Sequence, residues 1–294
     1  MLDTRNRRKR FDPPDLDARK DGQVKRQDIT PRDIVWFSAL QTHGTLPSTY
    51  IHAFGGGSYK GTLTRLKQLY HAGYVVRPRD QRRSDRANYQ PVSYQLADKG
   101  WDILERRGIA DSLTTSFRGH TLHQFMVSCL TASIHLSCVK HGITYISQED
   151  IFRDARCARK ELTLPFEKSI IKPDQFFGIR YADEKVRFFA VEAERAEKSM
   201  ARYVEKLRPY DAIIQNRTFR SEWGIPNMRV LVFTASSNRT RKMMEPLEGL
   251  LNQDHFLFRH KEHFDVQWLV PPVMHDLFEE PWITTGGEFD ISRA

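Results

Sequence analysis

The sequence is poor in the residues that build covalent or zinc-based scaffolds. Its 294 residues include three cysteines, Cys129, Cys138 and Cys157, and contain no CxxC pair. Three thiols without such a pair exclude a disulfide framework and a cysteine zinc site. The low number of cysteines also fits a reducing compartment, so we expect a cytoplasmic protein.

Long apolar runs are also missing. Near the middle of the chain, the longest stretch without Asp, Glu, Lys or Arg covers residues 119–139, but it contains three histidines and several Ser and Thr residues. Such a stretch is too polar for a bilayer span. The first residues, MLDTRNRRKRFD, lack the apolar core of a secretory signal. We therefore expect that this chain is not an integral membrane protein and that it has no membrane partner.

Acidic residues are outnumbered by basic ones. Lys and Arg total 46 against 37 Asp and Glu, which gives a net charge of +9. With 39% hydrophobic and 28% charged residues, the chain as a whole is not expected to be disordered, and its length predicts about two domains. The excess of positive charge makes a polyanion such as double-stranded DNA the first partner to consider.

The distribution of apolar residues predicts four segments along the chain. Residues 1–29 carry many charges, two adjacent prolines and almost no large apolar groups, which indicates a disordered basic arm. Residues 30–108 form a first domain, residues 109–119 a linker and residues 120–294 a second domain. We expect a two-domain chain of α+β or α/β class, and a homodimer is compatible with the sequence.

Helix and strand signals in residues 30–108 follow the order of a winged helix-turn-helix. Thr30-Pro31-Arg32-Asp33 is a strong helix start. Helices are predicted over about 30–42, 48–54 and 58–73, strands over 74–78 and 91–98, and a closing helix over about 99–107. In this architecture the third helix enters the major groove, and the loop between the strands lies along the DNA backbone or minor groove.

Basic residues gather where such a domain would contact DNA. Between residues 60 and 86, only Asp80 and Asp85 oppose them. The candidate DNA-binding residues are Lys60, Arg65, Lys67, Arg77, Arg79, Arg82, Arg83 and Arg86. A solvated hairpin is the alternative interpretation of this charge run, but the order of elements and the placement of charge both favour DNA contact.

The second domain is predicted to hold a mixed sheet in which a hairpin ends in two carboxylates. Helices over about 120–140 and 238–251 and strands over 143–147, 228–235 and 266–272 accompany the hairpin, whereas residues 149–161 are polar and irregular. Alternation along the second hairpin strand places Glu192 and Glu194 on one face, about 7 Å apart. Carboxylates on an inward face need compensation from a divalent cation or from solvent at the strand end. The helix predicted to follow carries Lys198 and Lys206 on its more polar side.

The turn of this hairpin decides whether Asp174 can join the two glutamates. An even, two-residue loop would direct Asp174 to the opposite face. A three-residue loop over 183–185 would instead place Asp174 across from Glu194, at a Cβ separation of about 5 Å. We therefore predict a three-residue loop, or a bulge near Pro173, in this hairpin.

Pro173-Asp174, the hairpin and Glu192-Ala193-Glu194 resemble the core of the PD-(D/E)xK nucleases. The resemblance implies a restriction-endonuclease-like fold in which Asp174 and Glu192, with Glu194, bind Mg²⁺. The third position of that motif is normally a lysine that orients or activates water, and here it is Glu194. A migrated lysine, Lys198 or Lys206, would then take over this role.

The longer arrangement is similar to the replication-relaxation family of plasmid, phage and conjugative elements. The similarity covers most of residues 30–260: a winged helix, the PD and E-x-acid motifs, and a helix with Lys206 and Tyr210. It implies a DNA-binding protein that nicks or cleaves DNA in plasmid replication or mobilisation, together with other replication or transfer proteins. The alternative is a replication or transcription regulator whose nuclease domain is degenerate and serves assembly. A covalent tyrosine nucleophile, Tyr203 or Tyr210, is a weaker interpretation, because Tyr203 falls on the apolar helix face.

Overall fold

The computed structural model describes residues 28–83, 89–110, 122–167, 169–194, 200–262, 264 and 269–293. The chain divides into two compact units. Unit 1 consists of Met1–Ala132 with Val266–Val273, and unit 2 of Ser133–Asp265 with Met274–Ala294. The division falls inside the helix Leu122–Lys140. Most of the predicted arm and of the predicted 109–119 linker lies outside the described residues.

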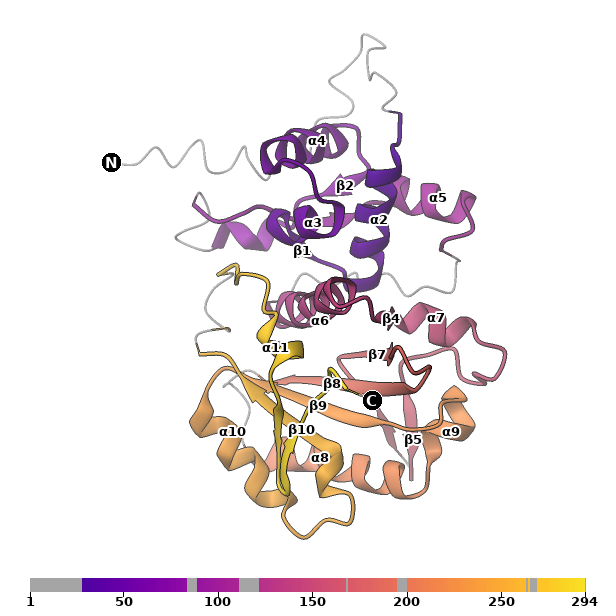
Figure 1. Ribbon diagram of the computed structural model, residues 1–294, viewed down its shortest axis with the longest axis vertical. Coiled ribbons are helices and arrows are strands. Elements are labelled where there is room, and N and C mark those ends of the chain that lie inside the picture. Colours follow the sequence, from indigo (N-terminus) through magenta and orange to yellow (C-terminus); the bar gives the residue numbers. More distant parts are fainter. Residues whose placement is uncertain are drawn as a thin grey trace. The chain divides into compact units, whose positions relative to one another are not determined.

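Unit 1 is built from helices and one small antiparallel sheet (Figure 1). The sheet has the strand order β1-β3-β2. In chain order, the elements of unit 1 are α2 (Pro31–His43), β1 (Leu46–Pro47), α3 (Ser48–Gly55), α4 (Tyr59–His71), β2 (Val75–Val76), a 3₁₀ turn η1 (Arg79–Arg83), β3 (Ser93–Leu96) and α5 (Asp98–Arg106). The predicted helices and the two predicted strands are confirmed, although both strands are shorter than expected, and β1 adds a short strand that the sequence did not indicate.

Local capping explains why these helices start where they do. The Thr30 hydroxyl accepts a hydrogen bond from the Asp33 amide at 3.2 Å, and the Asp33 carboxylate accepts one from the Thr30 amide at 2.8 Å, which is a capping box. Ser58 caps α4 by accepting from the Gly61 amide at 3.1 Å. Gly55 lets α3 approach the Trp36 indole, because a Cβ atom at this position would lie 2.1 Å from the indole nitrogen.

Unit 2 is organised around a seven-stranded sheet with the order β12-β11-β10-β9-β8-β7-β4 (Figure 1). β8, β9 and β10 are parallel to one another, whereas β7 and β4 on one side and β11 and β12 on the other pair antiparallel. The sheet strands are β4 (Thr144–Ile146), β7 (Gln175–Arg180), β8 (Val186–Glu194), β9 (Arg229–Thr234), β10 (Phe256–His260), β11 (Trp282–Thr284) and β12 (Gly287–Phe289). The chain is therefore of mixed α+β class.

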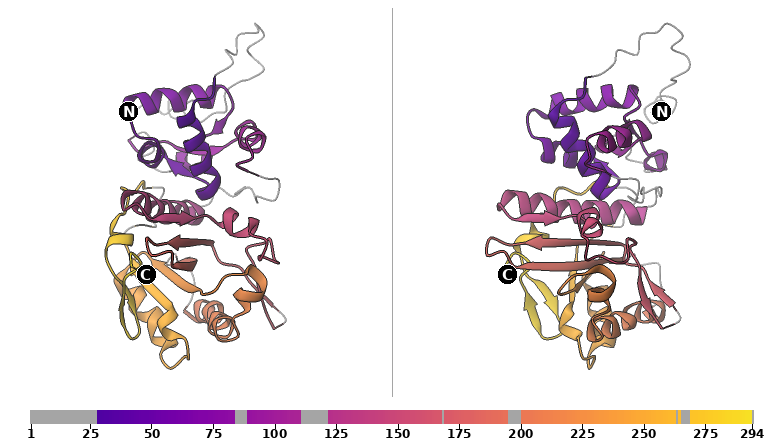
Figure 2. Two further views of the ribbon diagram at one scale, coloured as in Figure 1. Left: turned by 45° about the vertical axis from the view of Figure 1, so that its right-hand side comes forward. Right: turned by 90° about the vertical axis from the view of Figure 1, so that its right-hand side faces the viewer.

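Helices cover both faces of this sheet (Figure 2). On one face, Phe188, Ala190 and Val230 form a core with Tyr203, Leu207 and Tyr210. On the other face, His135 stacks on Tyr145, with ring centroids 4.3 Å apart. The helix α6 (Leu122–Lys140) contributes its residues 133–140 to unit 2. The remaining elements of unit 2 are α7 (Gln148–Arg153), a separate hairpin of β5 (Leu164–Phe166) and β6 (Ser169–Ile171), α8 (Met200–Gln215), α9 (Thr218–Trp223), α10 (Ser237–Met244), the 3₁₀ turns η2 (Glu245–Leu247) and η3 (Gln253–His255), and α11 (Asp276–Glu279).

Three predicted elements of unit 2 need correction. The helix predicted over 238–251 ends at Met244, and a 3₁₀ turn and further turns follow it. The segment predicted to be irregular from 149 onward begins as α7, because Ser147 and Asp150 form a capping box that starts a helix. The last strand, predicted over 266–272, is absent from the described part of that range: residues 269–272 are not in a strand, and residues 265–268 lie outside the described residues. The sheet is instead completed by β10 and by β11 and β12, whose three-residue lengths leave little periodicity to detect.

One described helix, α6, is long and apolar enough to cross a membrane by length and composition. In its most apolar window, 72% of the residues are buried inside the protein. Burial of this kind is typical of the core helix of a soluble protein.

Candidate active site

Glu192 and Glu194 lie at the carboxyl end of β8 and share one face of the sheet, as the sequence predicted. Glu192 contacts Lys206 and Tyr210 of α8, and Glu194 contacts Arg239 of α10. The two glutamates are only 2% and 3% exposed. Their charges are therefore removed from bulk water and need partners within the protein.

The β7–β8 hairpin has the predicted three-residue loop, but the loop comprises residues 182–184 and not 183–185. The Tyr181 amide donates to the Lys185 carbonyl at 3.0 Å, and Glu184 takes a left-handed conformation with φ of 63°. Pairs along the ladder run from Arg180 with Val186 to Gln175 with Val191. One step further, Asp174 comes opposite Glu192 and not Glu194.

Asp174 is fixed at the start of β7 by backbone contacts. Its amide donates to the Val191 carbonyl at 2.9 Å, and its Oδ2 accepts from the Ala193 amide at 2.9 Å. These two bonds hold the carboxylate beside the end of β8 before any ligand binds.

Lys206 joins the two carboxylates. Its Nζ donates to Oε2 of Glu192 and lies 3.6 Å from Oδ1 of Asp174. The Tyr210 hydroxyl donates to the other oxygen of Glu192 at 2.6 Å. The side chains of Lys206 and Asp174 keep 27% and 16% exposure, so solvent reaches the cluster from their side. We call Asp174, Glu192, Lys206 and Tyr210 the carboxylate cluster.

Burial and the nearby Asp174 raise the pKa of Glu192 to about 8, while Lys206 and Tyr210 act in the opposite direction. Burial lowers the pKa of Lys206, but the carboxylates of Glu192 and Asp174 outweigh it and leave this pKa above its ordinary value. Two carboxylates thus share one ammonium group, so the carboxylate cluster lacks one positive charge when both acids are ionised.

The donor set suits a small hard cation. Within the described ranges, no group of three or more His, Cys, Asp or Glu side chains could hold a metal ion by itself. Mg²⁺ does not require such a group, because it usually keeps several waters and takes one or two carboxylates from the protein. The oxygens of Asp174 and Glu192 fit this requirement, and a bound Mg²⁺ would replace the proton of Glu192.

Glu194 belongs to a second ion pair. Its Oε2 lies 3.5 Å from the Arg239 guanidinium, which comes from the first turn of α10 and is 15% exposed. The sequence did not single out Arg239, because the partners lie on different elements and no motif spacing joins them. Glu194 therefore has a cation of its own, Arg239, while it lies on the same face of the sheet as Glu192.

The structure places one of the two candidate lysines and both candidate tyrosines. Lys206 lies in the carboxylate cluster, and Lys198 is outside the residues that the structure describes. Tyr203 and Tyr210 are 1% and 0% exposed, and burial raises the pKa of both well above 10. A buried phenol with a raised pKa is a poor covalent nucleophile, so the geometry does not favour that interpretation.

Two of the candidate DNA-binding arginines of unit 1 are engaged within the protein. Arg65 lies 2.7 Å from the buried carboxylate of Asp33 and donates to the Asp28 carbonyl at 2.6 Å. Arg77 stacks on the Tyr70 ring at 4.1 Å and donates to the Tyr94 hydroxyl at 3.1 Å. Their guanidinium groups hold elements of unit 1 together.

The remaining candidates fall into two sets. Lys60 and Lys67 are exposed on one side of α4, next to exposed Leu63 and Thr64, and Arg79 is exposed in η1. Only the backbone of Arg82 and Arg83 is described, and Arg86 lies outside the described residues. The exposed side of α4 therefore combines cations with side chains that can contact base edges.

The chain belongs to the replication-relaxation family, which matches residues 37–227. Membership of this family indicates a role in the replication or relaxation of plasmids or other mobile elements. The matched range contains α4 of unit 1 and the whole carboxylate cluster of unit 2. Neither a curated protein nor a solved structure matches the chain.

Proposed function

We propose that this protein binds double-stranded DNA of a mobile genetic element through a winged helix in unit 1 and nicks or cleaves it through a Mg²⁺-dependent nuclease-like site in unit 2. The observation that carries the proposal is the convergence of Asp174, Glu192 and Lys206 at the end of the β7–β8 hairpin.

DNA binding is supported by the arrangement of unit 1. Three helices precede β2 and β3, and α3 is tied to α4 by the His52–Thr62 contact at 3.0 Å and the Ser48–Tyr59 contact at 3.1 Å. This pairing holds α4 with Lys60 and Lys67 outward. A helix held in this way can enter a major groove, where its lysines would meet phosphates.

Nuclease chemistry is supported by the groups of the carboxylate cluster. A bound Mg²⁺ would polarise the scissile phosphate and lower the pKa of a bound water. Asp174 and Glu192 would hold the ion, and the Ala193 amide keeps Asp174 oriented. Lys206 is placed to stabilise negative charge that develops on the phosphate, and Tyr210 orients Glu192.

The test is the conversion of supercoiled plasmid to nicked DNA in the presence of Mg²⁺. We expect the wild type to nick, and Asp174→Asn and Glu192→Gln to be slower by about 100-fold or more. Asp183→Asn is the matched control, because Asp183 is an exposed carboxylate in the loop of the same hairpin. Nicking by Asp174→Asn at the wild-type rate would overturn the assignment of the site.

A second candidate function is that of a non-enzymatic replication or transcription regulator. The pairing of Glu194 with Arg239 favours it, because the nuclease motif normally has a lysine where Glu194 stands. Sequence-specific DNA binding by a wild-type protein that never nicks, with any divalent metal, would decide for this regulator. Unit 2 would then serve assembly with other replication or transfer proteins.

A further inference from the structure

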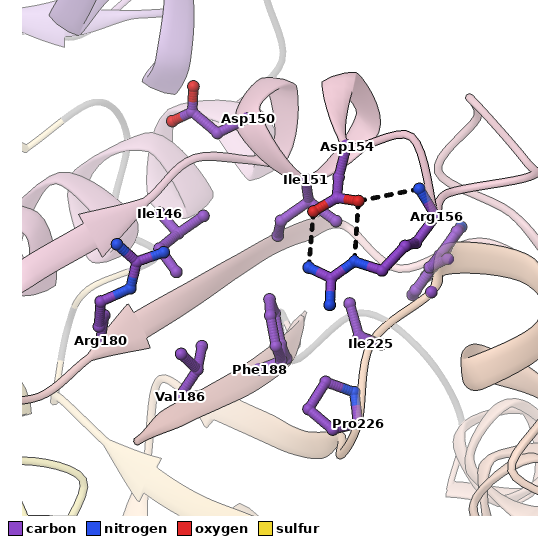
Figure 3. Close-up of a pocket in the computed structure, with 12 residues that line it drawn as sticks. Ile146, Asp150, Ile151, Asp154, Arg156, Arg180, Val186, Phe188, Ile225 and Pro226 are labelled. Atoms are coloured by element: carbon purple, nitrogen blue, oxygen red, sulfur yellow. Dashed lines mark hydrogen bonds and ion pairs between the residues drawn. The ribbon is translucent and has the colours of Figure 1, made fainter. Parts of the chain in front are cut away.

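A cavity of about 250 Å³ opens in unit 2 beside the loop end of the β7–β8 hairpin (Figure 3). It is separate from the carboxylate cluster, because Val186 begins β8 whereas Glu192 lies near its end, about 20 Å further along the strand. The apolar side chains that line the cavity are Ile146, Ile151, Val186, Phe188, Ile225 and Pro226.

Contacts outside the cavity hold its walls in place. Arg159 ties the segment after α7 to α9, since its amide donates to the Glu222 carbonyl at 2.7 Å and its side chain to the Glu222 carboxylate at 2.6 Å. Asn227 clamps β8 by donating to the Val186 carbonyl at 2.8 Å and accepting from the Phe188 amide at 3.1 Å. The cavity is therefore formed before a ligand enters, which lowers the entropic cost of binding.

A close backbone approach fixes one corner of the cavity. Gly224 has φ of +69°, and a Cβ atom there would lie 2.5 Å from the Arg156 carbonyl oxygen. Only glycine allows this conformation and this approach without strain. The wall that carries Arg156 and the wall that carries Ile225 are thereby held against each other.

The charged side chains around the cavity leave one cation uncompensated. Asp154 and Arg156 form a two-point ion pair at 2.7 and 2.9 Å (Figure 3). Asp150 accepts from the Ser147 hydroxyl at 2.7 Å and lies 3.6 Å from Arg153. Arg180, at the end of β7, makes no ion pair with any residue in the described part of the chain.

We propose that this cavity binds an apolar group that carries one carboxylate, either a small aromatic acid or the C-terminal residue of a peptide. The apolar walls would bury a ring or branched side chain, and the Arg180 guanidinium would receive the carboxylate. A nucleic acid strand is a poorer fit, because the walls of the cavity are mostly apolar and Arg180 is the one lining cation that is not paired with an acid of the described residues. This inference does not depend on the proposed nuclease activity.

The test compares two matched probes, N-acetyl-tryptophan and its neutral amide, N-acetyl-tryptophanamide, by ligand-detected NMR on the full chain. We expect the acid to bind about 10-fold tighter than the amide, as for a hydrogen bond to a charged group. Arg180→Gln should remove this difference and leave amide binding unchanged. Lys185→Gln is the control, because Lys185 is a 70% exposed cation in the same hairpin that pairs with Asp183 and does not line the cavity.

A second variant tests the location. Val186→Phe fills the cavity and should abolish binding of both probes, with the melting temperature measured to verify folding. An N-acetylated tripeptide ending in tryptophan distinguishes the two kinds of ligand. If it binds with the affinity of N-acetyl-tryptophan, the ligand is the C-terminus of a peptide. If it does not bind, the ligand is a small acid. Equal affinity for acid and amide, unchanged binding by Arg180→Gln, or no binding of either probe below about 10 mM would overturn the proposal.

Discussion

Lys206 of α8 lies with its Nζ 3.6 Å from Oδ1 of Asp174, at the start of β7, while it also donates to Glu192 near the end of β8. One ammonium group thus links three consecutive elements of the chain. It lies beside two acids of the nuclease-like motif, although it comes from the following helix and not from the strand position where Glu194 stands. In the proposed nuclease site, Lys206 would therefore take the role of the lysine that the motif normally has at the position of Glu194.

The raised pKa of Glu192 predicts that Mg²⁺ binding depends on pH. At a pH below the Glu192 pKa of about 8, Mg²⁺ must displace a proton from this carboxyl group. The affinity for Mg²⁺ therefore rises with pH and levels off above about pH 8. We expect the increase in melting temperature caused by Mg²⁺ to be small near pH 6.5 and largest above pH 8. Glu192→Gln should abolish the increase, whereas Asp183→Asn should keep it. An increase of equal size at all pH values would contradict the assignment of Glu192 as a ligand.

The same group predicts a loss of stability with pH in the absence of metal. The folded protein keeps a proton on Glu192 up to a pKa of about 8, whereas the unfolded chain releases it above the ordinary value of 4.5. The free energy of unfolding therefore falls as pH rises from about 4.5 to about 8, by a few kcal/mol at most. Chemical denaturation of the wild type and of Glu192→Gln checks this, since the variant should lose the slope.

The buried pair of Asp33 and Arg65 predicts a stability effect in unit 1. Arg65→Met would leave the fully buried Asp33 carboxylate without its cation, at a cost of about 3 kcal/mol. Replacing both residues, by Asp33→Leu with Arg65→Met, should cost less than the single change. Denaturant unfolding measures both, and a harmless Arg65→Met would contradict the role given to this pair.

Acid should weaken unit 1 through the same carboxylate. Burial raises the pKa of Asp33, but the hydrogen bonds from Arg65 and Thr30 outweigh it and hold this pKa below its ordinary 3.8. The pair is therefore fully stabilising above pH 3.8, and the stabilisation is lost as pH falls through the lowered pKa. We expect the free energies of unfolding of the wild type and of Arg65→Met, measured between pH 2 and 6, to differ at the upper end of this range and to become equal only at its acid end.

DNA binding is expected to depend steeply on salt. If about five phosphates are neutralised, log K falls with log salt at a slope near −4 to −5. Changing Lys60 and Lys67 to alanine should reduce the slope by about 2, and changing Arg82, Arg83 and Arg86 should flatten it further. Lys185→Ala in the hairpin of unit 2 serves as the control. An affinity that does not respond to salt would exclude the proposed mode of binding.

Much of unit 1 could be predicted because its signals are local. The capping box of Thr30 and Asp33, the Ser58 cap and the alternation in residues 93–96 each lie within a few residues of the element that they start or form. The short strands β1, β11 and β12 could not be predicted, because two or three residues show no period and form strands only beside a partner.

The candidate site shows the same division. The alternation of side chains along β8 by itself determined that Glu192 and Glu194 share a face of the sheet. The acids of the motif and Lys206 could also be recognised from their types and their order in the sequence. Only the tertiary structure decided that Asp174 pairs across from Glu192, because that depends on where the three-residue loop begins. It also decided that Lys206 joins these two acids while Arg239 takes Glu194, and that Arg65 and Arg77 serve the core of unit 1. Charges that attract each other across distant elements leave no spacing in the sequence, so folding alone selects their partners.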